Sequence, residues 1–248
     1  MKLEVKNLFF SYNSKNPVLE NINLDLTENS ISVLAGMNGC GKSTLLKLLA
    51  GLLKPASGSI ILDGLPLKDI SRRELAKKLA YLPQTPELPA GFSVEELVLC
   101  GRYPHASTRQ HDRGVVAQLL ETIGISHLAK RQLSTLSGGE RQRCFLALVL
   151  AQEPSILLLD EPFSALDPAA FRELFNLLIK VKQQYSLTVI IVLHDINRAL
   201  NYGDRIIGIK NGKISFDLPS HQATDHIQVL YNLPDSAIIC NTEKKFFF

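Results

Sequence analysis

Three strand-length apolar runs constrain the fold of this chain more than any other feature. Residues 31–35, 156–159 and 189–193 are apolar at nearly every position rather than at every second one. A strand of this kind is buried on both faces, which is typical of parallel sheets covered by helices on each side. Helical stretches separate these runs, so the sequence predicts an α/β fold built on a mostly parallel sheet.

The other predicted elements are shorter or less sharply bounded. We expect strands at 2–5, 22–26, 59–64 and 79–82, with a turn at 13–17 between the first two. Helices are expected at 44–53 and 168–184, while 85–152 is helical with breaks at prolines and glycines. We expect residues 1–248 to form a single domain, with a helical subdomain at about 85–152 and a weakly patterned tail at about 217–248.

Composition narrows the functional classes. The net charge is only +3 and no dense Lys/Arg cluster occurs, so we expect no nucleic-acid binding. The cysteines Cys40, Cys100, Cys144 and Cys240 lack C-x-x-C spacing, which argues against a metal or disulfide framework. No run approaches the roughly 20 apolar residues of a transmembrane helix. The N-terminus also lacks a signal-peptide pattern, so the chain is expected to stay in the cytoplasm.

A glycine-rich loop follows the first apolar run. Residues 36–43, Gly-Met-Asn-Gly-Cys-Gly-Lys-Ser, fit the phosphate-binding pattern G-x-x-x-x-G-K-[ST]. Backbone N–H groups of such a loop point at phosphate oxygens, with a helix N-terminus behind them. Lys42 is expected at the β- and γ-phosphates of ATP, and the Ser43 hydroxyl at Mg²⁺. The residues predicted to contact the nucleotide here are Gly36, Asn38, Gly39, Cys40, Gly41, Lys42, Ser43 and Thr44.

Two carboxylates follow the run at 156–159. Asp160 and Glu161 would lie at the C-terminal edge of a strand, where ligands bind in open α/β sheets. Asp160 is predicted to hold Mg²⁺, and Glu161 to polarise the water that attacks the phosphate. The alternative is a pair of solvated acids at a strand end.

Residues 136–143, Leu-Ser-Gly-Gly-Glu-Arg-Gln-Arg, predict a second phosphate-binding surface. Ser137, Gly138 and Gly139 would lie at the start of a helix, whose dipole favours an anion. One chain does not need two such surfaces for one triphosphate, whereas two chains meeting head to tail do. We therefore expect a homodimer in which each chain closes the nucleotide of the other. A simple helix cap is the alternative.

With these motifs in order, the chain resembles the ABC ATPases from about residue 2 to residue 218. The resemblance implies a P-loop ATPase with a mostly parallel sheet core, an N-terminal antiparallel β subdomain and a helical signature subdomain. It also implies that Tyr12 stacks on adenine and that Gln84 senses Mg²⁺ and faces the membrane partner. Residues 164–167 would cross the dimer interface, and His194 would contact the γ-phosphate. Taken singly, Tyr12 could be a core aromatic, Gln84 a surface amide and His194 a strand-end histidine.

A subfamily resemblance follows from residues 92–98, 101–105 and 194–205, which look like the importer ATPases for iron-siderophores, haem and cobalamin. This implies transport through a separate membrane permease, with a substrate-binding protein acting indirectly, at the cytoplasmic face of the membrane. Gln84 and residues 92–105, including Arg102, would face the permease. Residues 162–167, by contrast, resemble a sequence motif found across many ABC importers, which leaves other classes of transported substrate open.

Two rival functions can be weighed from the sequence. A soluble ABC protein acting on DNA or ribosomes would resemble members with a long coiled coil or two ATPase units, and neither is present. A nucleotide or sugar kinase would not need the motif at 136–142. Within the phosphate loop, Cys40 lies beside Lys42 and a helix N-terminus, a setting that favours a reactive thiolate. A buried, inert thiol is the alternative.

Overall fold

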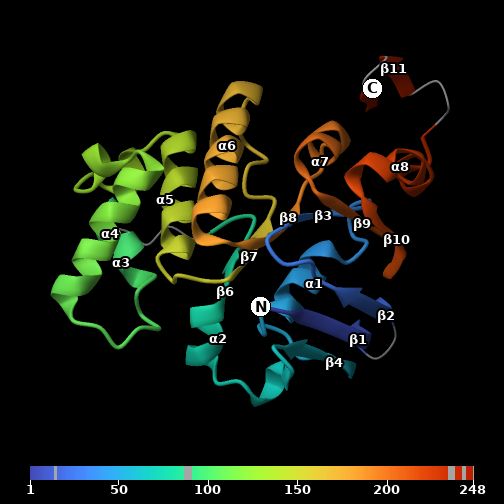
Figure 1. The fold of residues 1–248 in the computed structure, drawn as a ribbon, viewed down its shortest axis with the longest axis horizontal. Helices are drawn as coiled ribbons and strands as arrows, with labels where there is room; N and C mark the ends of the chain where they lie inside the picture. The colour runs from blue at the N-terminus through green and yellow to red at the C-terminus, as the bar shows by residue number, and fades with distance from the viewer. Residues whose placement is uncertain (14–15, 87–90, 234–237, 242–243, 248) are drawn as a thin grey trace. The chain divides into compact units, whose positions relative to one another are not determined.

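The computed structural model describes residues 1–13, 16–86, 91–233, 238–241 and 244–247 (Figure 1). The chain divides into two compact units. The first unit comprises residues 1–69 and 188–248, and the second comprises residues 70–187. Among the described residues, no helix is both long and apolar enough to cross a membrane.

An antiparallel sheet opens the first unit. Its strand order is β2-β1-β4-β5, with β1 at Leu3–Ser11, β2 at Pro17–Asp25, β4 at Ser57–Leu62 and β5 at Leu65–Pro66. The predicted N-terminal antiparallel subdomain is thus confirmed. Strands β1 and β2 are longer than expected, and their pairing contains register shifts, the first between Val5 and Leu8. Asn7 and Asn21 adopt φ values of 47° and 51° in these strands, which interrupt the apolar alternation.

A second set of strands in the first unit has the order β10-β9-β3-β8. Strand β3 (Ile31–Ala35) runs parallel to both of its neighbours, β8 (Thr188–Val192) and β9 (Arg205–Lys210). Strand β10 (Lys213–Pro219) pairs antiparallel with β9. Every residue of β3 and β8 is buried, as their continuous apolar character predicts.

Short helices complete the first unit. These are α1 (Lys42–Leu49), η1 (Leu67–Asp69), α7 (Ile196–Tyr202), η4 (Ser220–Gln222) and α8 (Thr224–Tyr231), followed by the hairpin β11 (Ile238–Asn241) and β12 (Lys244–Phe247). The weakly patterned tail therefore contains a helix. Helix α8 buries Ile227 and Leu230 and contacts β9, beside which it lies in Figure 1.

The second unit places a parallel strand pair among helices. Strand β6 (Leu79–Leu82) pairs in parallel with β7 (Ile156–Asp160), both close to their predicted bounds. The helices are α2 (Arg72–Lys78), α3 (Val94–Cys100), α4 (Arg109–Ile123), η2 (Ser126–Leu128), η3 (Leu133–Thr135), α5 (Gly138–Leu150) and α6 (Pro168–Tyr185). Helices α3 to α5 fall within the range 85–152 that we expected to be helical. Residues 87–90 of that range lie outside the described residues.

Candidate nucleotide site

The phosphate loop joins β3 to α1 in the first unit, as predicted. Gly36 has a φ of 147°, and a Cβ atom there would lie 2.3 Å from the Ile209 carbonyl oxygen. Gly41 has a φ of 106°, and its Cβ would lie 2.6 Å from a Leu19 methyl carbon. Both positions therefore require glycine for conformation and for space. The loop can turn tightly enough for its backbone to surround a phosphate.

Lys42 lies inside this loop. Its side chain is buried, and Nζ donates to the carbonyl oxygens of Gly36 at 2.7 Å and Met37 at 3.0 Å. An ammonium group has three donors, and the third is directed at Cys40 Sγ at 3.9 Å, a weak acceptor that a phosphate oxygen could replace. Around it, Asn38 and Gly39 are exposed, Ser43 is half-buried and Thr44 is buried. The arrangement concentrates positive charge and backbone N–H groups at a helix N-terminus, which suits a polyphosphate anion.

Tyr12 is an exposed ring beside the loop rather than a core aromatic. Its exposed fraction is 62%, and its hydroxyl lies 3.2 Å from Thr44 Oγ1. The ring meets Phe10 edge-on, with centroids 4.9 Å apart. This contact and the hydroxyl fix the ring while its surface stays accessible for stacking.

Cys40 is 9% exposed, and its Sγ lies 3.9 Å from Lys42 Nζ. A Cβ on Gly36 would also meet Sγ, at 2.8 Å. The thiol thus fills a small space under the loop. This arrangement matches the buried, inert thiol and not the reactive thiolate, the two alternatives that the sequence allows. Cys144 is fully buried, and burial raises the pKa of its thiol to about 12. Cys100 is exposed.

Sequence reasoning missed Tyr231, the last residue of α8. The Gly36 N–H donates to the Tyr231 hydroxyl at 2.9 Å. A phenol is protonated at neutral pH, and burial raises the pKa of this one further above its ordinary value. No local motif marks this residue, because its partner lies 195 positions away in the chain.

The two predicted carboxylates lie at the end of β7 in the second unit. Asp160 is 3% exposed and accepts a hydrogen bond from the Tyr81 hydroxyl at 3.3 Å. Glu161 follows with a φ of 51°, a left-handed conformation that a non-glycine residue rarely adopts. Its Oε2 accepts a hydrogen bond from Gln84 Nε2 at 2.7 Å. The structure therefore brings Gln84 and Glu161 together, and it excludes the reading of two freely solvated acids.

Ser137 begins helix α5 as its N-cap. Its hydroxyl accepts from the Glu140 N–H, while its own N–H and hydroxyl donate to Glu140 Oε2, each at 2.8 Å. These donations lower the pKa of the Glu140 carboxyl. Ser137 thus forms the helix cap that was the alternative interpretation of this motif. Gly138 and Gly139 have no positive φ, and a Cβ on either would meet nothing within 4 Å, so this chain itself does not require glycine there.

His194 and the loop 164–167 lie next to helix starts. His194 is exposed and comes two residues after β8, ahead of Asp195, which caps α7 by accepting from the Arg198 N–H. Asp167 caps α6 by accepting from the N–H groups of Ala169 and Ala170. His194 therefore lies just after the end of a strand, as the simpler interpretation expected, and its side chain is exposed.

The expectation that Arg102 faces a permease is wrong. Arg102 is 4% exposed, donates to the Ala151 carbonyl at 2.8 Å, and forms ion pairs with Asp112 and Glu153, both at 2.9 Å. A guanidinium can be buried in this way because two carboxylates and a carbonyl oxygen accept hydrogen bonds or ion pairs from it. The neighbouring Tyr103 is 87% exposed instead. Within residues 101–105, the aromatic side chain is the one presented to solvent.

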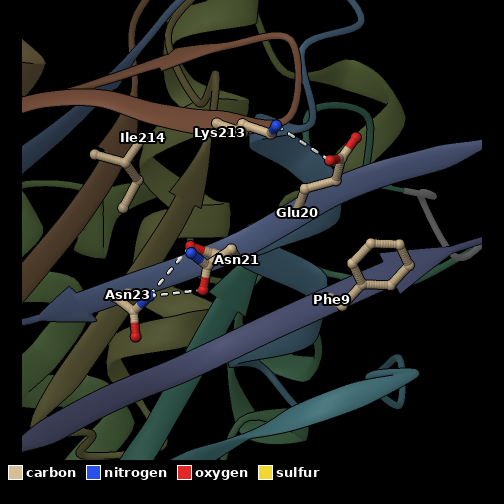
Figure 2. A pocket seen from close by; sticks show the side chains of 6 residues that line it. All are labelled: Phe9, Glu20, Asn21, Asn23, Lys213 and Ile214. Atoms are coloured by element: carbon tan, nitrogen blue, oxygen red, sulfur yellow. Dashed lines mark hydrogen bonds and ion pairs between the residues drawn. The ribbon is translucent and has the colours of Figure 1, made fainter.

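A hollow of about 500 Å³ in the first unit is lined by strands and not by the phosphate loop (Figure 2). Its lining residues are Phe9, Glu20, Asn21, Asn23, Lys213 and Ile214. Figure 2 shows the Asn23 amide donating to Asn21, and Lys213 paired with Glu20 at 3.2 Å. Because these polar groups already pair with one another, we assign no ligand to the hollow.

Comparison with known proteins identifies the family. Residues 19–164 match the family described as ABC transporter. The achromobactin transport ATP-binding protein CbrD of Dickeya dadantii is 43% identical over 198 residues, which cover 78% of this chain and 74% of that protein. The hemin import ATP-binding protein HmuV of Shewanella denitrificans is 44% identical over 205 residues, 81% of each chain.

Among solved structures, the dimeric structure of MJ0796, a bacterial ABC transporter cassette, is similar to this fold. Its TM-score is 0.77 at 30% identity, covering 88% of this chain and 98% of that one. The structure thus has the fold expected of a P-loop ATPase, with the antiparallel sheet and the mostly parallel strands both present. The chain belongs to the ABC transporter family and is the ATP-binding, ATP-hydrolysing subunit of an ABC transporter.

Proposed function

We propose that this ATPase energises the import of a metal chelate, an iron-siderophore or haem, through a separate membrane permease. The similarity to two ATP-binding proteins of achromobactin transport and hemin import, each above 40% identity, carries the proposal. The chain would act at the cytoplasmic face of the membrane, and a substrate-binding protein would deliver the chelate to the permease.

The residues of the first unit fit binding of the triphosphate. The backbone of the phosphate loop and the Lys42 ammonium would hold the phosphates, Tyr12 would stack on adenine, and His194 would contact the γ-phosphate. The steric requirement for Gly36 and Gly41 supports this role, because it lets the loop turn tightly against Ile209 and Leu19, a conformation in which backbone N–H groups can surround a phosphate.

The donor set fits Mg²⁺, which prefers oxygen ligands from carboxylates and hydroxyls. Ser43 and Asp160 would hold the ion, with Gln84 close to it, and the bound ion would neutralise charge on the phosphates. The position of Asp160 supports this assignment, because ligands bind at the C-terminal ends of strands in open α/β sheets and Asp160 is the last residue of β7.

Glu161 would align the attacking water by accepting its proton in a hydrogen bond. The 2.7 Å bond from Gln84 supports this role, because it fixes the orientation of the carboxylate at the end of β7. The positive φ of Glu161 is consistent with a functional residue, since such strain is concentrated at active sites.

The proposed assembly is a head-to-tail homodimer in which Ser137, Gly138 and Gly139 complete the site of the partner chain. The open space around both glycines supports it. Since no described residue would clash with a side chain there, the requirement for small residues would come from another molecule that approaches the start of α5 closely. A phosphate at a helix N-terminus meets that description.

The cargo can be tested in the host cell. A strain lacking this gene should lose growth on haem or on one ferric siderophore as sole iron source, and wild-type protein should restore it. The Glu161→Gln variant, expressed at the same level, should not. Uptake of labelled cobalamin, an amino acid and a sugar serves as the control. Normal growth on every iron source, together with loss of another uptake, would refute the assignment.

A further inference from the structure

We propose that Tyr231 is a positioning residue of the phosphate loop, and that helix α8, in the weakly patterned tail, is part of the ATP site. The proposal rests on ATP binding by this chain and not on the identity of the cargo. It gives a role to a segment that the nucleotide motifs of the sequence do not include.

The contact is reciprocal. Gly36 N–H donates to the Tyr231 hydroxyl at 2.9 Å, and the same hydroxyl donates to the Gly36 carbonyl at 3.4 Å. A tyrosine hydroxyl has one hydrogen to donate, so Tyr231 uses it on this glycine. Gly36 is buried, and a buried N–H group that loses its partner is costly. Tyr231 therefore stabilises one particular conformation of the first peptide of the loop.

Helix α8 is held firmly enough to transmit this constraint. Ile227 and Leu230 are at most 1% exposed. Lys210 Nζ donates to the Val229 carbonyl at 3.0 Å and to Asn232 Oδ1 at 3.1 Å, which fixes the end of the helix where Tyr231 lies. Lys210 belongs to β9, the same strand whose Ile209 carbonyl packs against Gly36. The phosphate loop and helix α8 thus both contact strand β9.

The position of the contact separates its role from that of the phosphate ligands. Lys42 also donates to the Gly36 carbonyl, at 2.7 Å, from within the loop. The Gly36 N–H is engaged by Tyr231 and is not among the groups left for phosphate. Tyr231 would therefore keep the free loop in its binding conformation, so that ATP need not order it. Affinity falls in proportion to the fraction of molecules in which the loop is formed.

The test is Tyr231→Phe in the full chain, which removes the hydroxyl and keeps the ring. The Kd of Mg-ADP, measured by calorimetry, should rise about fivefold to tenfold because the loop is formed in fewer molecules. The KM for ATP should rise while kcat at saturating ATP stays unchanged. In the nucleotide-free protein, the Gly36 amide should exchange its hydrogen faster by a similar factor.

Two further variants separate positioning from general loosening. Ile227→Val removes one methyl group from the buried face of the same helix and keeps the hydroxyl, so it should lower the melting temperature and raise the Kd of Mg-ADP much less than Tyr231→Phe does. Lys210→Met frees the end of α8 but keeps the tyrosine, so it should raise the Kd by a smaller factor. A wild-type Kd in Tyr231→Phe, or an equal rise in Ile227→Val, would overturn the proposal. Binding of Mg-ADP needs neither permease nor chelate, so this result is independent of the cargo test.

Discussion

Replacing Arg102 with methionine should destabilise the helical part of the second unit. The variant keeps a long apolar side chain of similar reach but removes the charge that contacts Asp112, Glu153 and the Ala151 carbonyl. Asp112 is 15% exposed and would lose its ion-pair partner in a partly buried setting. The loss therefore concerns a structural network and not a docking surface.

The magnitude follows from the exposure of each partner. Removing one member of a buried ion pair costs about 3–5 kcal/mol. Glu153 is 54% exposed, so water screens that pair and its share is about 0–1 kcal/mol. Asp112 retains a hydrogen bond from Ser107, which places the total at the lower end, about 3 kcal/mol. For a chain of this size, about 2–4 °C per kcal/mol predicts a melting temperature lower by about 6–12 °C.

Thermal unfolding as a function of pH gives the sharpest assay. Hydrogen bonds from Ser107 and Arg102 lower the pKa of Asp112 below its ordinary 3.8. A carboxyl with a lowered folded pKa adds stability above its unfolded pKa and loses it as the pH falls through the folded value. The difference between wild type and Arg102→Met should therefore be full at pH 7 and shrink below about pH 4.

Tyr103→Ala is the matched control, since this neighbour is 87% exposed. Its melting temperature should stay within about 2 °C of wild type, as is usual for surface substitutions. If residues 101–105 face the permease, assembly with the permease should weaken in this variant even though its stability is unchanged. Surface substitutions usually change the free energy of unfolding by no more than about 0.5 kcal/mol. A melting temperature for Arg102→Met within about 2 °C of wild type would place it in that class and would refute the account of the buried network.

The remaining predictions concern the nucleotide site. Glu161→Gln should lower ATP hydrolysis by about a hundredfold or more, as loss of a general base does, while ATP binding survives and an ATP-bound dimer persists on gel filtration; hydrolysis near the wild-type rate would remove Glu161 from catalysis. Lys42→Ala and Ser137→Arg should each inactivate the homodimer, yet mixed dimers should recover part of the ATPase activity because one site escapes both lesions; verified mixed dimers without activity would count against the head-to-tail assembly. N-ethylmaleimide should label the exposed Cys100 before Cys40, as read by mass spectrometry. Labelling of Cys40 should abolish ATP binding, and bound Mg-ATP should protect Cys40 from the reagent. The Cys40→Ala variant should stay active and should resist inactivation by N-ethylmaleimide. Retained ATP binding after verified labelling of Cys40 would contradict this.

The elements predicted best are those whose signal is local. Strand β3 was predicted at its observed bounds because a nearly continuous apolar run ends at Gly36, and β6 because a similar run ends at Pro83. The phosphate loop follows from the spacing of glycines and a lysine, which directly encodes a backbone conformation. Strands β1 and β2 were predicted too short because Asn7 and Asn21 interrupt the alternation on which such a prediction depends.

What the sequence did not reveal depends on contacts between distant positions. The family resemblance of residues 92–105 placed Arg102 on the permease-facing surface, and only the structure supplies the partners that bury it. The tail was weakly patterned because α8 is just eight residues long and shows only two fully buried positions. Its link to Gly36 spans 195 residues, and no periodicity along the chain can indicate such a pair.

The capping box at the start of α5 has a consequence for how readily a dimer could open again. In this structure, the Ser137 hydroxyl and N–H are already bound to an anion, the Glu140 carboxylate. In the proposed dimer, a phosphate arriving at this helix would replace one negative acceptor with another instead of satisfying an unpaired donor. Because one charge-assisted hydrogen bond is exchanged for another of similar strength, the net gain from this contact is small. A subunit that must separate after every turnover benefits from that near balance, since a contact formed at little net gain is released at little cost.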